Sequence, residues 1–319
     1  MSLAIITTTN EGNILAADSM ETYRNALGDT REGSMTRMKL FQLSSRVGAV
    51  SCGLAFLDNK NIHQQMMMFK KEHKLEGLPV ADVVDKLYDF FYAKYQDYLK
   101  KAAERKVKSL EKRGKTDIQT SVELEVITAN FKENGKAKEK KYYMPIIEIL
   151  IAGHDPDGTN HVYKIVIPDP KEKNGIVEKS KEGQPGATWI GQTEVLVRII
   201  RGWSPQIKRS KHIKEMPDKA RDELLKHIDD QEYLVNWGTM TFQDAIEFAE
   251  LAIKTTESIQ RMTDGTWQLP GASPGVGGPV DVAIITPEKG FVWIKKKKLI
   301  VEGPDIDLDA LPDLPSANA

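Results

Sequence analysis

The second residue of the chain is a serine, a residue type that can do nucleophilic chemistry alone when it stands at an amino terminus. If Met1 is removed, Ser2 carries a hydroxyl that attacks a carbonyl carbon and an α-amine that accepts the hydroxyl proton. The unperturbed pKa of an α-amine is about 7.7 to 8.0, so this base works near neutral pH without a histidine. Because serine is small, we expect methionine aminopeptidase to remove Met1. No propeptide other than Met1 itself is then needed. A residue of this kind can cleave an amide bond through an acyl-enzyme.

The other residue types that often carry chemistry are few and scattered. The one cysteine, Cys52, lies in the apolar run at residues 47–54, and a single thiol makes neither an internal disulfide nor a structural zinc site. The histidines show no spacing typical of metal ligands: His63, His73, His154, His161, His212 and His227. We therefore predict no metal and no cofactor.

The charge and hydropathy of the chain limit the kinds of partner and the compartment that are expected. The formal net charge is −1 and the sequence pI is near 6.6, so no overall field attracts nucleic acid or an anionic membrane. No apolar stretch approaches the roughly 20 residues that span a bilayer, and the first residues lack the basic and apolar regions of a signal peptide. A lone thiol is consistent with a reducing compartment. We predict a cytoplasmic protein that binds neither nucleic acid nor membrane.

The elements that must position Ser2 alternate between strands and pairs of helices. Expected strands cover residues 3–9, 14–17, 39–43, 47–52, 146–152, 161–167, 280–286 and 290–294, and expected helices cover residues 55–72, 80–98, 194–200 and 241–262. Helices on the outer faces of two stacked antiparallel sheets satisfy this order, which predicts an α+β fold, a four-layer αββα sandwich. The predicted domain covers residues 2–302, and the acidic, proline-containing tail at 303–319 is expected to be poorly ordered.

Two stretches near the amino end carry a resemblance to proteasome β-type subunits and their bacterial and archaeal relatives, which are N-terminal-nucleophile hydrolases. They are EGNILAADS at residues 11–19 and KLFQL at residues 39–43. The family pattern is a nucleophile at the mature amino terminus, a glycine-containing turn, an Ala-Ala-Asp ending the second strand, and a lysine opening a later strand. A third stretch, GPVDVAIIT at residues 278–286, is similar to the family's C-terminal strand, which follows its final helix. The resemblance covers residues 2–75 and 146–294, and it implies the same sandwich fold.

The resemblance also implies four residues of a catalytic site. Counting back from Asp18 by the family's spacing reaches Ser2 without a gap, so Ser2 is the expected nucleophile. Lys39 is expected to place a cation near the Ser2 hydroxyl, and Asp18 to orient that lysine through a charge-assisted hydrogen bond. Gly53 keeps the family interval to Lys39 and is expected to donate its N–H to the tetrahedral oxyanion.

The sequence departs from the family pattern at the surroundings of the nucleophile. Family members usually carry an arginine two residues after the aspartate, where this chain has Met20. The family's Gly-Ser-Gly-Ser corresponds to residues 191–194, so the hydroxyl that helps to hold the amine comes from Thr193 or is replaced by Gln192. By the resemblance, Asp264, just after the last expected helix, is expected to take the place of the second family aspartate, which positions the amine. These departures keep open the alternative of an inactive structural subunit with the same fold.

The partners follow from the resemblance as well. It implies a peptidase whose substrates are peptides or proteins, with Ser2 where threonine peptidases have threonine, and a chain assembled as a homo-oligomer, with a ring as the family form. A small-molecule amidohydrolase of the wider N-terminal-nucleophile group remains a second alternative. The sequence carries no indication of ring size, of cleavage preference or of an unfoldase partner.

Residues 100–141 have no counterpart in an ordinary proteasome subunit. Lysine and arginine dominate this segment, but acidic residues interleave with them: Glu104, Glu111, Glu123, Glu125, Glu133 and Glu139. This mixture favours a solvated helical or hairpin projection, an inserted arm that can pack on a neighbouring subunit. The alternative is a cationic footprint that binds nucleic acid.

Overall fold

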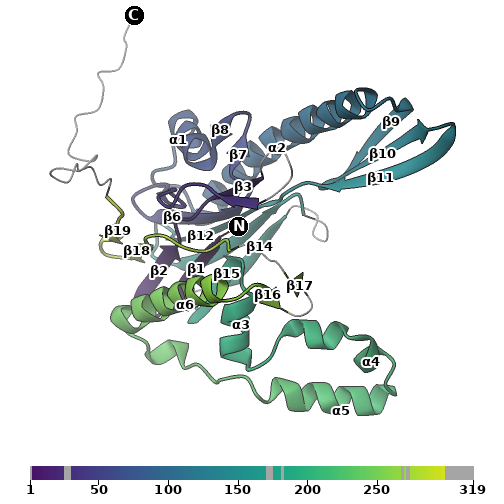
Figure 1. Cartoon of the computed structure of the whole chain (residues 1–319). Helices are drawn as coiled ribbons and strands as arrows, with labels where there is room; N and C mark the ends of the chain where they lie inside the picture. Colours follow the sequence, from purple (N-terminus) through teal and green to yellow (C-terminus); the bar gives the residue numbers. More distant parts are fainter. Residues whose placement is uncertain are drawn as a thin grey trace, which may run out of the picture.

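Two five-stranded antiparallel sheets form the centre of this computed structural model of the chain (Figure 1). The structure describes residues 2–24, 30–169, 175–180, 183–266, 269–270 and 274–298. The first sheet has the order β15 (Gly186–Gly191), β1 (Leu3–Thr9), β2 (Gly12–Ala17), β18 (Asp281–Thr286) and β19 (Gly290–Lys295). The second has the order β14 (Ile176–Ser180), β13 (Asn160–Ile167), β12 (Ile147–His154), β6 (Val47–Gly53) and β5 (Leu40–Gln42).

The hairpin expected at the amino end is β1 and β2. The two strands pair from Ala4 opposite Ala17 to Thr9 opposite Gly12, so the turn is the two residues that the sequence offers for it, Asn10 and Glu11. All residues of both strands are buried, as is typical of a sheet covered on both faces. This hairpin fixes Ser2 at one end of the first sheet.

Three apolar clusters hold the sheets and helices together. One lies between the two sheets and joins side chains of β1, β2, β6, β12, β15 and β18. A second packs α1 (Ile62–Glu72) and α2 (Val80–Glu111) on β5, β6, β12 and β13. The third packs α3 (Glu194–Arg201) and α6 (Phe242–Met262) on β1, β2 and β18. Helices therefore cover the outer face of each sheet, and Thr241 caps α6 as expected.

The helix expected to begin at residue 55 begins later, and this part of the prediction was wrong. A short hairpin of β7 (Phe56–Leu57) and β8 (Lys60–Asn61) comes first. Asp58 and Asn59 form its turn with φ of 49° and 62°, a left-handed conformation that these residue types tolerate. Asn61 then starts α1 with a capping box, because its side chain accepts from the Gln64 N–H and the Gln64 side chain accepts from the Asn61 N–H.

The segment expected to be an arm contains the end of α2 and a three-stranded sheet of β9 (Thr116–Glu123), β10 (Val126–Glu133) and β11 (Lys136–Tyr143). This sheet extends away from the two large sheets (Figure 1). Two small apolar clusters pack it on α2, one around Ile127 and one around Phe131 with Leu110. The arm therefore has apolar contacts of its own, separate from the main core.

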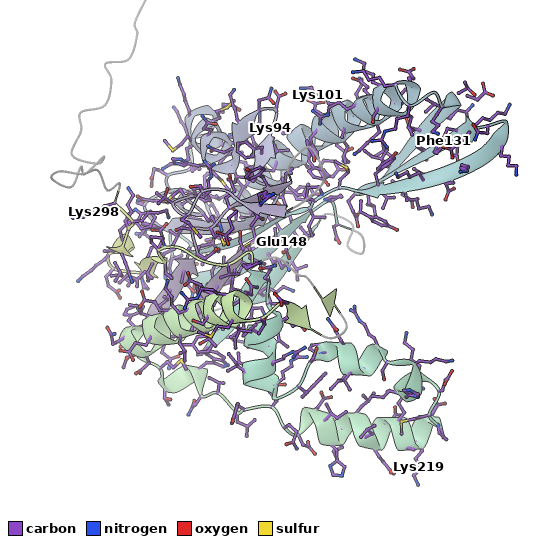
Figure 2. The ribbon with its side chains drawn as sticks, in the orientation of Figure 1. Lys94, Lys101, Phe131, Glu148, Lys219 and Lys298 are labelled. Atoms are coloured by element: carbon purple, nitrogen blue, oxygen red, sulfur yellow. The ribbon has the colours of Figure 1, made fainter. Side chains whose placement is uncertain are left out.

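A second projection, residues 203–240, carries elements that the sequence did not indicate. It contains η1 (Pro205–Arg209), α4 (Lys211–Lys214), α5 (Asp218–Asp229) and η2 (Trp237–Thr239). None of the residues of α5 is buried, so no apolar stripe marks this helix in the sequence. Phe131 on the arm and Lys219 on α5 mark the two projections, which lie far apart (Figure 2).

The remaining strands are short pairs: β3 (Thr22–Arg24) with β4 (Thr30–Glu32), and β16 (Gly265–Thr266) with β17 (Leu269–Pro270). Among the residues given above, none of the helices combines the length and the apolar character that a bilayer crossing needs. Met1 and the tail expected to be disordered, residues 303–319, lie outside the described residues.

Candidate active site

Asp18 is the fixed point of the candidate site. It follows β2 directly and is fully buried. Its Oδ1 accepts from the Leu3 N–H at 3.1 Å, and its Oδ2 accepts from the N–H groups of Met20 and Gly277 at 3.2 and 3.1 Å. Burial raises the pKa of the Asp18 carboxyl, and the charge of Lys39 and the hydrogen bonds from Gly277 and Leu3 act against that rise. The carboxylate is thus held in one orientation by backbone from three segments.

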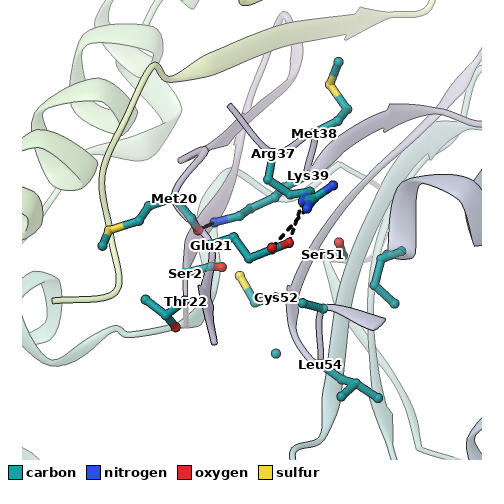
Figure 3. Close-up of a pocket in the computed structure, with 13 residues that line it drawn as sticks. Ser2, Met20, Glu21, Thr22, Arg37, Met38, Lys39, Ser51, Cys52 and Leu54 are labelled. Carbon is teal, nitrogen blue, oxygen red and sulfur yellow. Dashed lines mark hydrogen bonds and ion pairs between the residues drawn. The ribbon is translucent and has the colours of Figure 1, made fainter. Parts of the chain in front are cut away.

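Lys39 completes a buried ion pair with Asp18. It precedes β5, and its Nζ lies 2.8 Å from Asp18 Oδ1. The same ammonium donates to the Met20 carbonyl (Figure 3). The side chains of Lys39 and Asp18 are 8% and 0% exposed. A charge-assisted hydrogen bond of this kind between buried groups leaves the lysine little freedom to turn away.

Ser2 lies at the start of β1, beside this ion pair, and is buried. Its carbonyl accepts from the Gln192 N–H at 2.7 Å. The neighbouring Gly191 has a φ of 89°, and a Cβ there would lie 2.0 Å from the Ser2 carbonyl oxygen. Only glycine permits this approach of backbone to backbone. The end of β15 therefore holds Ser2 closely from one side.

Gly53 ends β6 on the other side of the same pocket. Its φ is 97°, and a Cβ on it would lie 2.1 Å from the Ile146 carbonyl oxygen. The following N–H, of Leu54, donates to that oxygen at 2.8 Å. The glycine thus lets β6 end in a left-handed residue where the second sheet meets the pocket.

One pocket brings most of the predicted site residues together. Ser2, Lys39 and Gly53 all line it, and Asp18 lies behind Lys39. The pocket also contains groups that the sequence analysis did not assign to a site: Met20, Glu21, Arg37, Ser51 and Cys52. Glu21 and Arg37 form a bidentate ion pair, with Nε to Oε2 at 2.5 Å and Nη2 to Oε1 at 3.0 Å. Two of these lining groups had a signal in the sequence: Met20 stands at the position of the family's arginine, and Cys52 directly precedes Gly53.

Cys52 lies next to Ser2 in this pocket, with its sulfur directed toward the serine (Figure 3). Burial raises the pKa of the Cys52 thiol far above its ordinary value, with Lys39 acting against this rise. The thiol is therefore protonated at neutral pH, and the uncharged form is a weak nucleophile. Cys52 fits a lining role rather than a second nucleophile.

The structure does not bring Thr193 and Asp264 to the pocket that holds Ser2. Thr193 stands at the N-cap of α3 and lines a different cavity, between α3 and α6. Asp264 is exposed just after α6. Gln192, which lies between Gly191 and Thr193, accepts through its Oε1 from the Gln260 amide at 2.8 Å. The backbone of residues 191–192, rather than a hydroxyl of Thr193, is what contacts Ser2 here.

Known proteins add little to this picture. No protein-family model matches the chain, and no curated protein matches it. Among solved structures, the chain is similar to the Anbu (Gly-1) mutant from Hyphomicrobium sp. strain MC1, with 11% sequence identity and a TM-score of 0.44. The match covers 93% of this chain and 86% of that chain.

Proposed function

We propose that the chain is an N-terminal-nucleophile peptidase of the proteasome type, with Ser2 as its nucleophile after removal of Met1. The observation that carries the proposal is the buried Asp18–Lys39 ion pair behind a pocket that Ser2 and Gly53 also line. Such a pocket combines a hydroxyl, a fixed cation and a left-handed glycine at a strand end. These are the groups that an amide hydrolase needs for attack, charge stabilisation and close approach of the acyl group.

The proposed mechanism uses only groups of this chain and water. The Ser2 Oγ attacks the carbonyl carbon of the scissile amide while the Ser2 α-amine takes the hydroxyl proton. The Gly53 N–H stabilises the oxyanion, and the Lys39 ammonium lowers the cost of negative charge on Oγ. The amine then passes its proton to the leaving nitrogen, which leaves an acyl-enzyme. Water adds to the ester carbonyl, the carboxylic acid leaves, and Oγ regains its proton.

The proposal includes the architecture. We interpret the two sheets with their outer helices as the four-layer αββα sandwich of N-terminal-nucleophile hydrolases, because apolar clusters fill all three spaces between the layers. We also propose that the protein is cytoplasmic and assembles as a homo-oligomer, with the projecting segments available for contacts between copies. Size-exclusion chromatography with light scattering measures the assembly directly.

Intact mass and a covalent probe test the nucleophile. We expect purified protein to lack Met1, and a hydroxyl-directed acylating inhibitor to add its mass at Ser2. The adduct should survive Cys52→Ala, which removes the neighbouring thiol. On fluorogenic peptides, Ser2→Ala should lose activity by about 1,000-fold or more, and Ser2→Thr should retain a hydroxyl and activity. Retention of Met1, or a Ser2→Ala variant as active as wild type, overturns the proposal.

A second function, an inactive structural subunit of the same fold, is favoured by one observation. Thr193 and Asp264, the residues expected to hold the amine, do not line the pocket of Ser2. On this alternative the protein assembles but neither cleaves peptides nor reacts with the inhibitor. Turnover of simple acyl amides without turnover of peptides would instead indicate a small-molecule amidohydrolase.

A further inference from the structure

A second buried lysine–aspartate pair lies next to the first one. Asp281 begins β18 and pairs across the sheet with Ala17, the residue before Asp18. Lys297 follows β19, and its ammonium contacts Asp281 Oδ2 while its backbone N–H donates to Asp281 Oδ1 at 2.8 Å. Asp281 is fully buried, and the Lys297 side chain is 5% exposed. This pair is as inaccessible to water as the pair formed by Asp18 and Lys39.

Each member of the second pair is adjacent to a segment that carries a member of the first. Asp281 lies opposite Ala17 at the end of β2, next to Asp18. The Lys297 Nζ lies 4.0 Å from the sulfur of Met38, the residue before Lys39. Charges in a poorly solvated region interact more strongly than they do in water. Accordingly, burial and then the charge of Lys39 lower the pKa of Lys297 to about 8, while Asp18 acts in the opposite direction.

Most of the other ionisable groups around the two pairs are compensated. Three carboxylates have cations of their own: Glu21 with Arg37, Glu148 with Lys164, and Glu257 with Lys254. Burial lowers the pKa of His63 on α1 and raises that of Cys52 on β6, so both are uncharged at neutral pH. The ammonium of Lys296 lies over the ring of Trp293. The two buried pairs are therefore the main sources of electric field at one another.

We propose that Asp281 and Lys297 are positioning residues that set the electrostatic potential at Lys39 and Ser2 without contacting the substrate. Two ammonium groups and two carboxylates balance in this cluster. Removal of either member of the second pair leaves one charge uncompensated beside Lys39. The inference builds on the proposed function of Ser2, but its physical content, the coupling of Lys297 to Lys39, is measurable without catalysis.

Titration of Lys297 by NMR tests the coupling, because the interaction between two charges is reciprocal. Protein labelled with lysine carrying ¹³C at Cε reports each lysine, and Lys297→Arg assigns the Lys297 signal. Lys39→Met removes a positive charge, so the pKa of Lys297 should rise from about 8 by about one unit. Asp18→Asn removes a negative charge, so the same pKa should fall by a similar amount. Lys295→Met, on β19 with its ammonium on the partly exposed Glu250, is the matched control and should leave it unchanged.

The double variant Asp18→Asn/Lys39→Met separates charge from structure. It replaces both charged side chains by uncharged ones of similar volume, and it keeps the test decisive if a single variant is too unstable to titrate. Its Lys297 should titrate within about 0.3 unit of wild type, because both charges of the first pair are gone. Two single variants that shift the pKa of Lys297 in the same direction, or a double variant that shifts it as far as a single one, overturn the proposal.

Activity provides a separate outcome. If the wild-type protein hydrolyses peptides, the acid limb of its pH–rate profile should move up in Lys297→Met and down in Asp281→Asn, by about one unit each. If the wild-type protein hydrolyses nothing, the proposed function fails while the titration of Lys297 still decides whether the two buried pairs are coupled.

Discussion

The candidate site and the projecting arm use the same pairing of lysine with carboxylate in opposite surroundings. In the site, the side chains of Lys39 and Asp18 are 8% and 0% exposed, whereas those of Lys132 and Asp117 in the arm are 53% and 64% exposed. Exposed pairs are screened by water and salt and add little to stability. Formation of a buried pair costs much desolvation free energy, and the loss of one partner leaves the other charge buried and unsolvated. The difference indicates that pairing in the arm serves solubility, while pairing in the site enforces one geometry.

Breaking the buried pair is expected to have the largest effect. Asp18→Asn leaves the Lys39 ammonium without its carboxylate, so we expect a loss of about 3–5 kcal/mol in the free energy of unfolding. Peptide hydrolysis, measured on the folded fraction, should fall at least about 100-fold because the cation is no longer held near Ser2. Urea unfolding and fluorogenic peptides measure the two effects.

The matched control is the corresponding change in the arm, Asp117→Asn, which removes the partner of Lys132. Its unfolding midpoint and its activity should equal those of wild type within error. Equal destabilisation by the two variants would contradict the distinction between the two regions.

Glycine substitutions extend the comparison to the backbone. A Cβ at Gly191 would lie 2.0 Å from the Ser2 carbonyl oxygen, whereas one at Gly135, in the turn between β10 and β11, meets nothing within 4 Å. Both glycines have positive φ, 89° and 75°. Gly191→Ala should therefore cost about 2–4 kcal/mol through strain and overlap, and Gly135→Ala about 1 kcal/mol through strain alone.

Activity separates these two glycines more sharply than stability does. Gly191→Ala displaces the residue proposed as the nucleophile, and a shift of about 1 Å there should reduce kcat/KM about 100-fold. Gly135→Ala should leave kcat/KM unchanged. A fully active Gly191→Ala variant would show that the contact with Ser2 does not set the site geometry.

Phe131→Ala tests whether the arm unfolds separately from the core. Phe131 packs with Leu110 and Ala129 in a cluster that shares no buried residue with the three large ones. We expect a loss of about 2–3 kcal/mol that is confined to the arm. Hydrogen exchange should accelerate in residues 116–143 and remain at the wild-type rate in β1, β2 and β6. Faster exchange throughout the chain would mean that the arm and the core unfold together.

The sequence predicted the structure well where paired strands are also neighbours along the chain. The hairpin of β1 and β2 is local, so its turn, its strands and the position of Ser2 at its start followed from residue types alone. Lys39 and Gly53 were predicted from the interval that the family resemblance implies, and both line the pocket of Ser2. The predicted start of α1 at residue 55 was wrong. The apolar stripe extends upstream of the helix, but the tight turn at Asp58 and the capping box at Asn61 place the start at Ile62.

The rest of the site depends on contacts between distant segments, which periodicity does not encode. Asp281 and Lys297 lie 16 residues apart along the chain. Asp281 lies beside the end of β2 because of the register of β18 on β2, and Lys297 lies against Met38. Likewise, Gly191 contacts Ser2 because β15, at residues 186–191, pairs with β1, at residues 3–9, although the two strands lie far apart along the chain. Helix α5 has no buried residue, so neither its existence nor its position left an apolar signal.

The smallest effect expected is in the acid titration of the arm. Hydrogen bonds from Lys115 and Lys138 lower the pKa of Glu133 from 4.5 to about 2. Because its folded-state pKa is depressed, this group adds stability above pH 4.5 and loses it as the pH falls through about 2. NMR titration of the Glu133 carboxyl carbon should therefore show a midpoint well below that of an ordinary glutamate, and salt should raise the midpoint, since the side chain is still 27% exposed to solvent. Glu133→Gln should leave the unfolding midpoint at neutral pH nearly unchanged. A large loss there would mean that ion pairs in the arm matter to this fold as much as the buried pair of Asp18 and Lys39.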